Sequence, residues 1–343
     1  MNKKVTITLV FLLVMFTALG AYFFYISPGE RDRSHLDERV FEFQARALEK
    51  MDSERADYSG AVRDLETALK DEAFKNTDQE GSLKTQLSRA IAHVDDPSIP
   101  GHDHSGLAKT VSILKEVASN TYYSPHIRST AIYLLADALL IHYDEQLMRN
   151  LVFSGPDFSG LLKQNDPFLG IANIFSLAGD TSENPRADYY AANLYAEKLL
   201  SDPPRTEGEK TFLADAIRVR LARGDKLMQD PAIFAIVDPY VGSLEKRNKG
   251  EAYGLRAELL AKKYLLNPSA GDQDKETVGA EFEKALGILS NLSSQTAKRV
   301  EMRIRFSYAH WLAEAYSEGR ASQIKQVLDS VFSSGNRVVS ESE

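Results

Sequence analysis

The sequence predicts an all-α fold that follows one apolar N-terminal helix. From residue 36 onward, apolar residues recur at positions i, i+3, i+4 and i+7, which is the spacing of one helix face. No segment shows the alternation of apolar and polar residues that a half-buried strand requires. Near the N-terminus, residues 5–26 form a run of twenty-two residues without a single charge. These observations indicate a helical domain attached to a hydrophobic helix.

Residues 5–26 are expected to span a membrane. Twenty-two helical residues rise roughly 33 Å, which matches the roughly 30 Å hydrocarbon core of a bilayer. A cleaved signal peptide is the alternative, with Ala18 and Gly20 as the small residues of its cleavage site. That cleavage would leave the apolar, aromatic residues 21–26 as the new N-terminus, whereas aromatic residues at this place are typical of a membrane interface. We therefore interpret the segment as a retained anchor.

The orientation of the anchor rests on the short basic tail that precedes it. Lys3 and Lys4 lie before the apolar run, but three arginines follow within residues 27–39, so the number of basic residues does not decide. A short basic tail usually stays in the cytoplasm, and a long following domain can cross the membrane regardless of its charge. The sequence thus predicts a single-pass protein of the inner (cytoplasmic) membrane with its helical domain on the periplasmic or extracellular side. Its parts are a cytoplasmic tail at 1–4, a transmembrane anchor at 5–26 and an α-helical domain at 27–343.

Periodicity divides the domain into helices. We expect them at 36–52, 57–75, 82–95, 105–119, 127–145, 167–179, 185–201, 207–223, 249–265, 275–292, 296–318 and 321–333.

Caps and prolines support this division. Four acidic or amide residues precede a proline and fit an N-cap followed by proline at the first helical position. They are Asp166, Asn184, Asp230 and Asp238. Thr206 and Glu209 fit a capping box, and Gly179, Gly224 and Gly319 fit helix ends. Clustered Pro, Gly, Ser and Asp predict long loops at 96–106 and 152–166.

Composition excludes several classes of function. The chain has 343 residues, is 43% hydrophobic and 26% charged, and is therefore expected to bury a core. Its net charge is −8, and residues 27–343 carry 39 basic against 49 acidic side chains, so that nucleic acid is not an expected partner. The absence of cysteine excludes disulfides, thiolate metal sites, a cysteine nucleophile and a lipid-modified cysteine.

Small and large apolar residues recur in a fixed order in several helices. Ala61, Leu65 and Ala68 have the spacing of Val278, Phe282 and Ala285, with a leucine following in each case. A second pattern, in which an apolar residue is followed by Leu or Tyr, a small residue and another apolar residue, occurs three times. Its members are Ile132, Leu135, Ala136 and Leu139; Ala187, Tyr190, Ala191 and Leu194; and Ala309, Leu312, Ala313 and Tyr316. Two helices of a hairpin approach closely only where one presents a small side chain. We therefore expect helix contacts at Ala61, Ala68, Ala136, Ala285 and Ala313.

These patterns resemble the two helices of the tetratricopeptide repeat, over about half of the chain. The resemblance implies a degenerate solenoid of helical hairpins with a concave surface that binds proteins or peptides. The layout of one anchor before such helices is also similar to that of bacterial envelope proteins, including the ancillary subunit of the secretion translocon. The repeats depart from the family in period, because the second pattern recurs after 55 and 122 residues rather than at multiples of 34. An irregular helical bundle without true repeats is the alternative.

The loop before residue 106 gathers the side chains best suited to a metal. Residues 93–106 read HVDDPSIPGHDHSG, and His102 and His104 are close enough to share one zinc ion. No helix supplies the paired histidines of a metallohydrolase, and polar residues with Gly and Pro are common in solvated loops. We therefore predict neither a metal site nor a cofactor here.

Other motifs also favour a structural role. The segment FSGPDFSG at 153–160 is interpreted as two turns pinned by Phe153 and Phe158. Four basic residues on one predicted helix fit an acidic peptide, but a solvated face is the preferred interpretation. They are Lys298, Arg299, Arg303 and Arg305. Tyr122 and Tyr123 are expected to pack in the core, although they also suit a hairpin end or the lining of a groove.

The sequence contains no phosphate-binding glycine loop and no serine-nucleophile motif. The first hypothesis is therefore a non-enzymatic, membrane-anchored scaffold that binds other proteins. The alternatives are an envelope metal-dependent enzyme that uses His102 and His104, and a helical domain that binds a soluble ligand between its helices.

Overall fold

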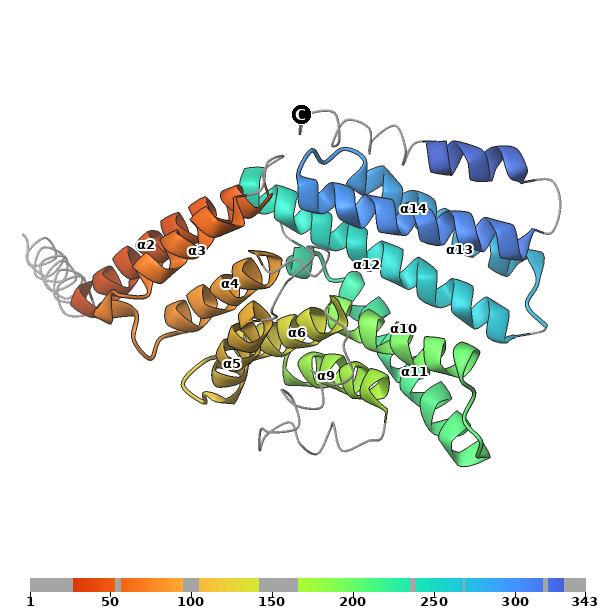
Figure 1. Ribbon diagram of the computed structural model, residues 1–343, viewed down its shortest axis with the longest axis horizontal. Coiled ribbons are helices and arrows are strands. Elements are labelled where there is room, and N and C mark those ends of the chain that lie inside the picture. The colour runs from red at the N-terminus through yellow and green to blue at the C-terminus, as the bar shows by residue number, and fades with distance from the viewer. Residues whose placement is uncertain are drawn as a thin grey trace, which may run out of the picture.

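The computed structural model describes residues 27–52, 57–94, 105–141, 166–234, 239–267, 269–316 and 320–329 (Figure 1). The predicted tail at 1–4 and anchor at 5–26 lie outside these residues. No helix among the described residues is long and apolar enough to cross a bilayer.

Every regular element in the described part of the chain is helical, which confirms the all-α class. The helices of the N-terminal half are α2 (Ser27–Asp52), α3 (Tyr58–Ala68), η1 (Glu72–Phe74), α4 (Asp78–Val94), α5 (Ser105–Ser119), α6 (Pro125–Ile141) and α9 (Pro167–Thr181). The others are α10 (Pro185–Ser201), α11 (Glu207–Met228), η2 (Pro231–Phe234), α12 (Pro239–Leu266), α13 (Asp272–Leu289) and α14 (Gln295–Ala315). Residues 321–329 are also helical.

Most helices pack on the helix that follows them in the chain. Contacts run from α2 through α3, α4, α5, α6 and α9 to α10, and again from α12 through α13 to α14. Helix α11 lies beside α10, while α12 crosses the molecule and contacts α10, α13 and α14 (Figure 1). Helix α12 therefore joins the two parts of the stack.

The buried apolar side chains form three clusters, and α12 contributes to two of them. The N-terminal cluster includes Leu65 and Leu83. The largest cluster lies around Phe175 and receives Leu255 from α12. The C-terminal cluster lies around Phe282 and receives Ala257 and Ala261 from α12.

The end of α2 is held against the C-terminal half. The Asp52 carboxylate accepts a hydrogen bond of 2.7 Å from Nη1 of Arg247 in α12. Both side chains are buried, with exposed fractions of 8% and 4%. Nearby, the hydroxyl of Thr296 donates to the backbone carbonyl of Met51 at 3.5 Å. The first described helix therefore closes onto α12 and α14.

Several predicted helix boundaries are wrong. Helix α2 begins at Ser27 rather than at residue 36, and α11 ends at Met228 rather than at residue 223. Helix α12 begins at Pro239 rather than at residue 249, because the polar segment at 243–249 continues the helix. The helix predicted at 57–75 ends at Ala68. Asp71 then caps the short η1 turn, and Asn76 takes a left-handed conformation with φ of 58°. A left-handed residue ends a helix, and asparagine tolerates it better than most residues.

The predicted N-caps are confirmed wherever they fall in the described residues. Asp166 accepts backbone N–H groups of Phe168 and Leu169, and Asn184 accepts that of Ala187. Asp230 and Thr206 cap η2 and α11 in the same way. Asp238 lies outside the described residues. The chain thus marks its helix starts locally.

The predicted glycine helix ends are not confirmed. Gly224 lies inside α11, where a Cβ atom would stand 2.7 Å from Cε1 of Tyr189. Gly179 lies inside α9, where a Cβ atom would stand 2.6 Å from Oδ1 of Asp188. Both glycines permit close packing against α10 rather than ending a helix. Gly319 lies outside the described residues.

Four of the five alanines predicted to lie at helix contacts are buried. Ala61, Ala136 and Ala285 are 0% exposed, and Ala68 is 1% exposed. The prediction is wrong for Ala313, which is exposed. The buried positions of α14 include Ile304, Tyr308, Trp311 and Leu312. These positions, at i, i+4, i+7 and i+8, define a face that turns Ala313 toward solvent.

Candidate functional site

Five polar side chains from α6, α10, α12 and α14 meet near the centre of the molecule. We call this group, Tyr133, Arg186, Tyr190, Glu251 and Arg303, the central polar site. The Tyr190 hydroxyl donates to Oε1 of Glu251 at 2.8 Å and accepts from Nη1 of Arg303 at 2.7 Å. Arg186 forms an ion pair with Glu251, and its Nη2 donates to the Tyr133 hydroxyl at 2.7 Å.

Local structure places the α10 side chains in this site. The Asn184 cap and Pro185 set the start of α10, so that Arg186 and Tyr190, four residues apart, share one face. The Tyr190 ring stacks on Phe175 with centroids 4.9 Å apart. The Arg186 guanidinium lies 4.8 Å from the centroid of the Tyr133 ring. Aromatic packing therefore orients the groups that carry the hydrogen bonds.

The electrostatics of the site keep Glu251 ionised. Burial favours the neutral carboxyl, but attraction by Arg186 and Arg303 outweighs burial and lowers the pKa of Glu251 to about 2. Burial raises the pKa of both tyrosines, so both hydroxyls remain neutral at physiological pH. The site is thus a fixed network of one carboxylate, two guanidinium groups and two hydroxyls.

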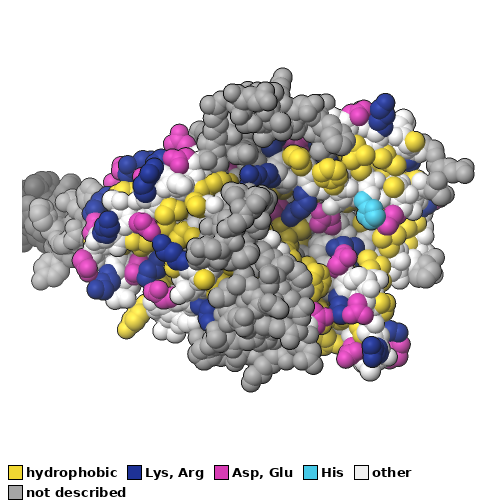
Figure 2. Space-filling model, viewed as in Figure 1, with side chains coloured by type: hydrophobic (Ala, Val, Ile, Leu, Met, Phe, Trp, Pro, Cys, Tyr) yellow, Lys and Arg dark blue, Asp and Glu magenta, His cyan; other side chains and the backbone are white. Residues whose placement is uncertain are grey.

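Arg303 is the member of the site that reaches solvent. Its side chain is 39% exposed, against 6% for Glu251. Of its nitrogens only Nη1 donates a hydrogen bond within the described residues, since Nε and Nη2 have no acceptor. Nη2 of Arg303 lies 3.6 Å from Oε1 of Glu251, and Nε lies 4.0 Å from Oε1 of Glu258. Figure 2 shows basic and acidic side chains side by side near the middle of one face.

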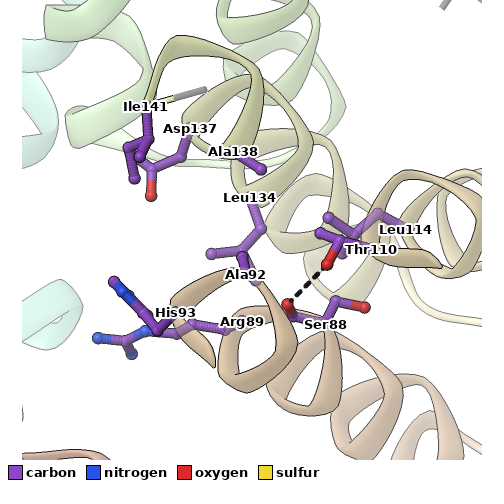
Figure 3. A pocket seen from close by; sticks show the side chains of 10 residues that line it. All are labelled: Ser88, Arg89, Ala92, His93, Thr110, Leu114, Leu134, Asp137, Ala138 and Ile141. Carbon is purple, nitrogen blue, oxygen red and sulfur yellow. Dashed lines mark hydrogen bonds between the residues drawn. The ribbon is translucent and has the colours of Figure 1, made fainter. Parts of the chain in front are cut away.

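A small cavity lies beside the site, between α4, α5 and α6 (Figure 3). Its volume is about 20 Å³, which is room for about one water molecule. The lining residues are Ser88, Arg89, Ala92, His93, Thr110, Leu114, Leu134, Asp137, Ala138 and Ile141. Asp137 comes from α6 and Arg89 from α4, and neither makes a hydrogen bond or ion pair to another described residue. These two charges are therefore open to a further group.

Asp137 is expected to titrate near neutral pH. Burial, followed by repulsion from Glu251, raises the pKa of Asp137 to about 6, although Arg186, Arg89 and Arg303 oppose the shift. The folded protein therefore keeps the proton up to about pH 6, whereas the unfolded chain loses it near pH 4. Because the folded state binds more protons in this window, the free energy of unfolding falls as pH rises from about 4 to about 6.

Asp137→Asn is expected to remove this loss of stability. At pH 7.5 the variant should be more stable than the parent by about 1–2 kcal/mol, since one pKa unit corresponds to about 1.4 kcal/mol and water screens part of it. Below pH 4 the variant and the parent should have the same free energy of unfolding. Urea unfolding at both pH values measures the difference. Asp202→Asn is the control, because a hydrogen bond from Lys198 lowers the pKa of this exposed residue. If Asp202→Asn raises the free energy of unfolding at pH 7.5 as much as Asp137→Asn does, the raised pKa of Asp137 is not the cause.

The predicted metal-binding candidates are not brought together in the described part of the chain. His102 and His104 lie outside it, as do Phe153 and Phe158. The described residues hold no group of three or more His, Asp or Glu side chains arranged for a metal ion. His93, at the end of α4, instead stacks on Tyr58 with ring centroids 4.9 Å apart.

The basic residues of α14 divide into three environments. Lys298 and Arg305 both contact the buried carboxylate of Glu301, at 2.9 Å and 2.6 Å. Arg303 turns toward the central polar site, and Arg299 is exposed. The prediction of one solvated face is therefore wrong for Arg303, because Tyr190 and two carboxylates attract it inward.

The tyrosine pair before α6 divides between core and solvent. Tyr123 is 2% exposed, and its hydroxyl donates to Oε2 of Glu80 at 3.1 Å. Tyr122 is 76% exposed. The prediction of core packing thus holds for Tyr123 and is wrong for Tyr122.

Sequence patterns pointed to Tyr190 as a packing position and to Arg303 as one of four basic residues, but did not connect the members of the central polar site. These members come from four helices, and only Arg186 and Tyr190 are close in sequence. One signal was present: Arg186 lies four residues before Tyr190 and therefore shares its helix face. No protein-family model, curated protein or solved structure matches this chain.

Proposed function

We propose that the chain is a membrane-anchored helical scaffold, similar to tetratricopeptide-repeat proteins, that binds another protein at the bacterial cell envelope. The observation that carries this proposal is the pair of open charges, Arg89 and Asp137, beside the central polar site. A partner that supplies a complementary group would complete the hydrogen bonding of these two side chains.

Two further features support the proposal. Consecutive helices pack on one another through small residues, as in solenoids that present long binding surfaces. The central polar site is fixed by its own hydrogen bonds, so it is preorganised for a partner. The location at the envelope rests on residues 5–26, which lie outside the described residues. The cavity beside Asp137 has too little volume to favour a soluble ligand, since ligand pockets typically measure about 300 Å³ or more.

Site-directed photocrosslinking in intact cells tests the proposal. A photoreactive p-benzoylphenylalanine in place of Ile141, an exposed residue that lines the cavity with Arg89 and Asp137, should give an adduct of defined mass with one partner protein. The same residue in place of Glu276, on the exposed side of α13, is the control and should give none. Equal adducts at both positions, or none at Ile141, would contradict binding at this face.

A further inference from the structure

One side of helix α14 is exposed along four turns. Residues 299, 302, 306, 310 and 313 follow one another at spacings of three or four, which places them on one side of the helix. Arg299, Phe306, His310 and Ala313 are exposed, and Met302 is half-buried. We call these five residues the α14 stripe. The stripe is about 21 Å long, from a rise of about 1.5 Å per residue.

The stripe has the surface chemistry of a helix-binding site. Phe306 is 49% exposed and is the largest apolar side chain on it. Ala313 permits close approach of another backbone, and a methionine such as Met302 adapts its shape to a partner. Figure 2 shows hydrophobic side chains gathered on the side of the molecule where α13 and α14 lie. A straight ridge of this kind packs against another helix, whereas an extended peptide needs a sheet edge or a groove.

The charges of α14 favour an acidic partner. The helix carries four basic and two acidic side chains, although the whole chain has a net charge of −8. Glu301 is held by Lys298 and Arg305 away from the stripe, and a carboxylate oxygen of Glu314 lies 3.2 Å from Nε2 of His310. Arg299 has no ion pair within the described residues. The exposed phenylalanine is thus accompanied by an uncompensated guanidinium.

We propose that the α14 stripe docks an acidic amphipathic helix of a partner protein. Apolar side chains of that helix cover Phe306 and Met302, and a carboxylate of that helix binds Arg299. This inference rests on the proposed scaffold function and names the chemistry of the partner. Photocrosslinking at Ile141 can succeed while this docking fails, so the two proposals fail separately.

Two synthetic peptides test the docking on the purified full-length chain. Both are helices of about 20 residues with leucine at positions i, i+3 and i+7, one with glutamate and the other with lysine on the flanks. The glutamate peptide should bind at least about tenfold more tightly than the lysine peptide, a difference of about 1.4 kcal/mol. Fluorescence anisotropy of labelled peptide measures both affinities. Equal affinities, or no binding of the glutamate peptide at millimolar concentration, would overturn the proposal.

Matched variants locate the binding. Phe306→Ser should lower the affinity for the glutamate peptide at least about tenfold. Phe212→Ser, at a 63% exposed phenylalanine of α11, should leave its affinity unchanged. Arg299→Glu should reduce or invert the preference for glutamate over lysine. An equal loss in the two serine variants overturns the proposal. The proposal is also overturned if a second copy of this chain covers the stripe. In that case sedimentation of the protein without peptide would show a dimer, and Phe306→Ser would dissociate it.

Discussion

Asp52→Ala is expected to lower the free energy of unfolding by about 3–5 kcal/mol, because it leaves the Arg247 guanidinium buried without its counter-ion. Arg247 is 3% exposed. Burial, together with repulsion from Arg89, already lowers the pKa of Arg247 to about 10, and Asp52 acts against both effects. Without Asp52, Glu251 still attracts Arg247, but Glu251 is already paired with Arg186. Chemical unfolding of the purified protein measures the loss.

An exposed ion pair provides the matched control for Asp52. Asp215 contacts Arg218 at 3.2 Å within α11, and their side chains are 62% and 75% exposed. Asp215→Ala is therefore expected to change the free energy of unfolding by less than about 0.5 kcal/mol. The double variant Asp52→Leu with Arg247→Met should recover most of the stability, because an apolar pair needs no counter-ion. If Asp52→Ala lowers the free energy of unfolding no more than Asp215→Ala does, the Asp52–Arg247 pair does not hold α2 against α12.

The Asp52–Arg247 pair also shows what the sequence could not predict. The two residues are 195 positions apart. Asp52 ends a segment with helical periodicity, whereas Arg247 lies in a polar stretch that breaks it. A helical pattern identifies the buried face but not the helix that will cover it. The contact that closes α2 onto the C-terminal half is therefore visible only in three dimensions.

Local signals, in contrast, predicted much of the fold. Helices α5 and α10 begin and end at the predicted residues, and α10 does so because Asn184 and Pro185 define its start. The start of α12 was missed because the polar stretch at 243–249 breaks the apolar period, although its residues continue the helix. Tertiary packing compensates for this weak amphipathic signal, since α12 packs against α10, α13 and α14 and Arg247 is buried beside Asp52.

The central polar site could not be predicted from the sequence either, because its members lie on helices that are far apart in the chain. Tyr190 was recognised by its spacing in a repeat-like pattern, but its hydroxyl partners, Glu251 and Arg303, lie on other helices. Buried polar residues look like interruptions in a helical pattern until their partners are known. The residues of the repeat-like pattern on α6 and α10 are thus buried beside an ion-pair network, and no local spacing in the sequence indicates that network.

Ala136→Leu is expected to destabilise the protein by about 1–3 kcal/mol, because the larger side chain overpacks a helix contact. Ala136 is 0% exposed within the largest apolar cluster, where α6 packs on α5 and α9. The same substitution at Ala313 is the control, since that alanine lies in a helix of similar kind but faces solvent. Ala313→Leu should change stability by less than about 0.5 kcal/mol.

Comparison of the two leucine variants separates packing from helix propensity. Alanine and leucine are both good helix formers, so propensity alone predicts nearly the same small change at both positions. Thermal unfolding followed by circular dichroism at the helix band should instead give a lower melting temperature for Ala136→Leu alone. If the two variants melt at the same temperature, Ala136 does not lie at a close helix contact. The repeat-like spacing of residues 132–139, on which the scaffold proposal partly depends, would then lose its structural basis.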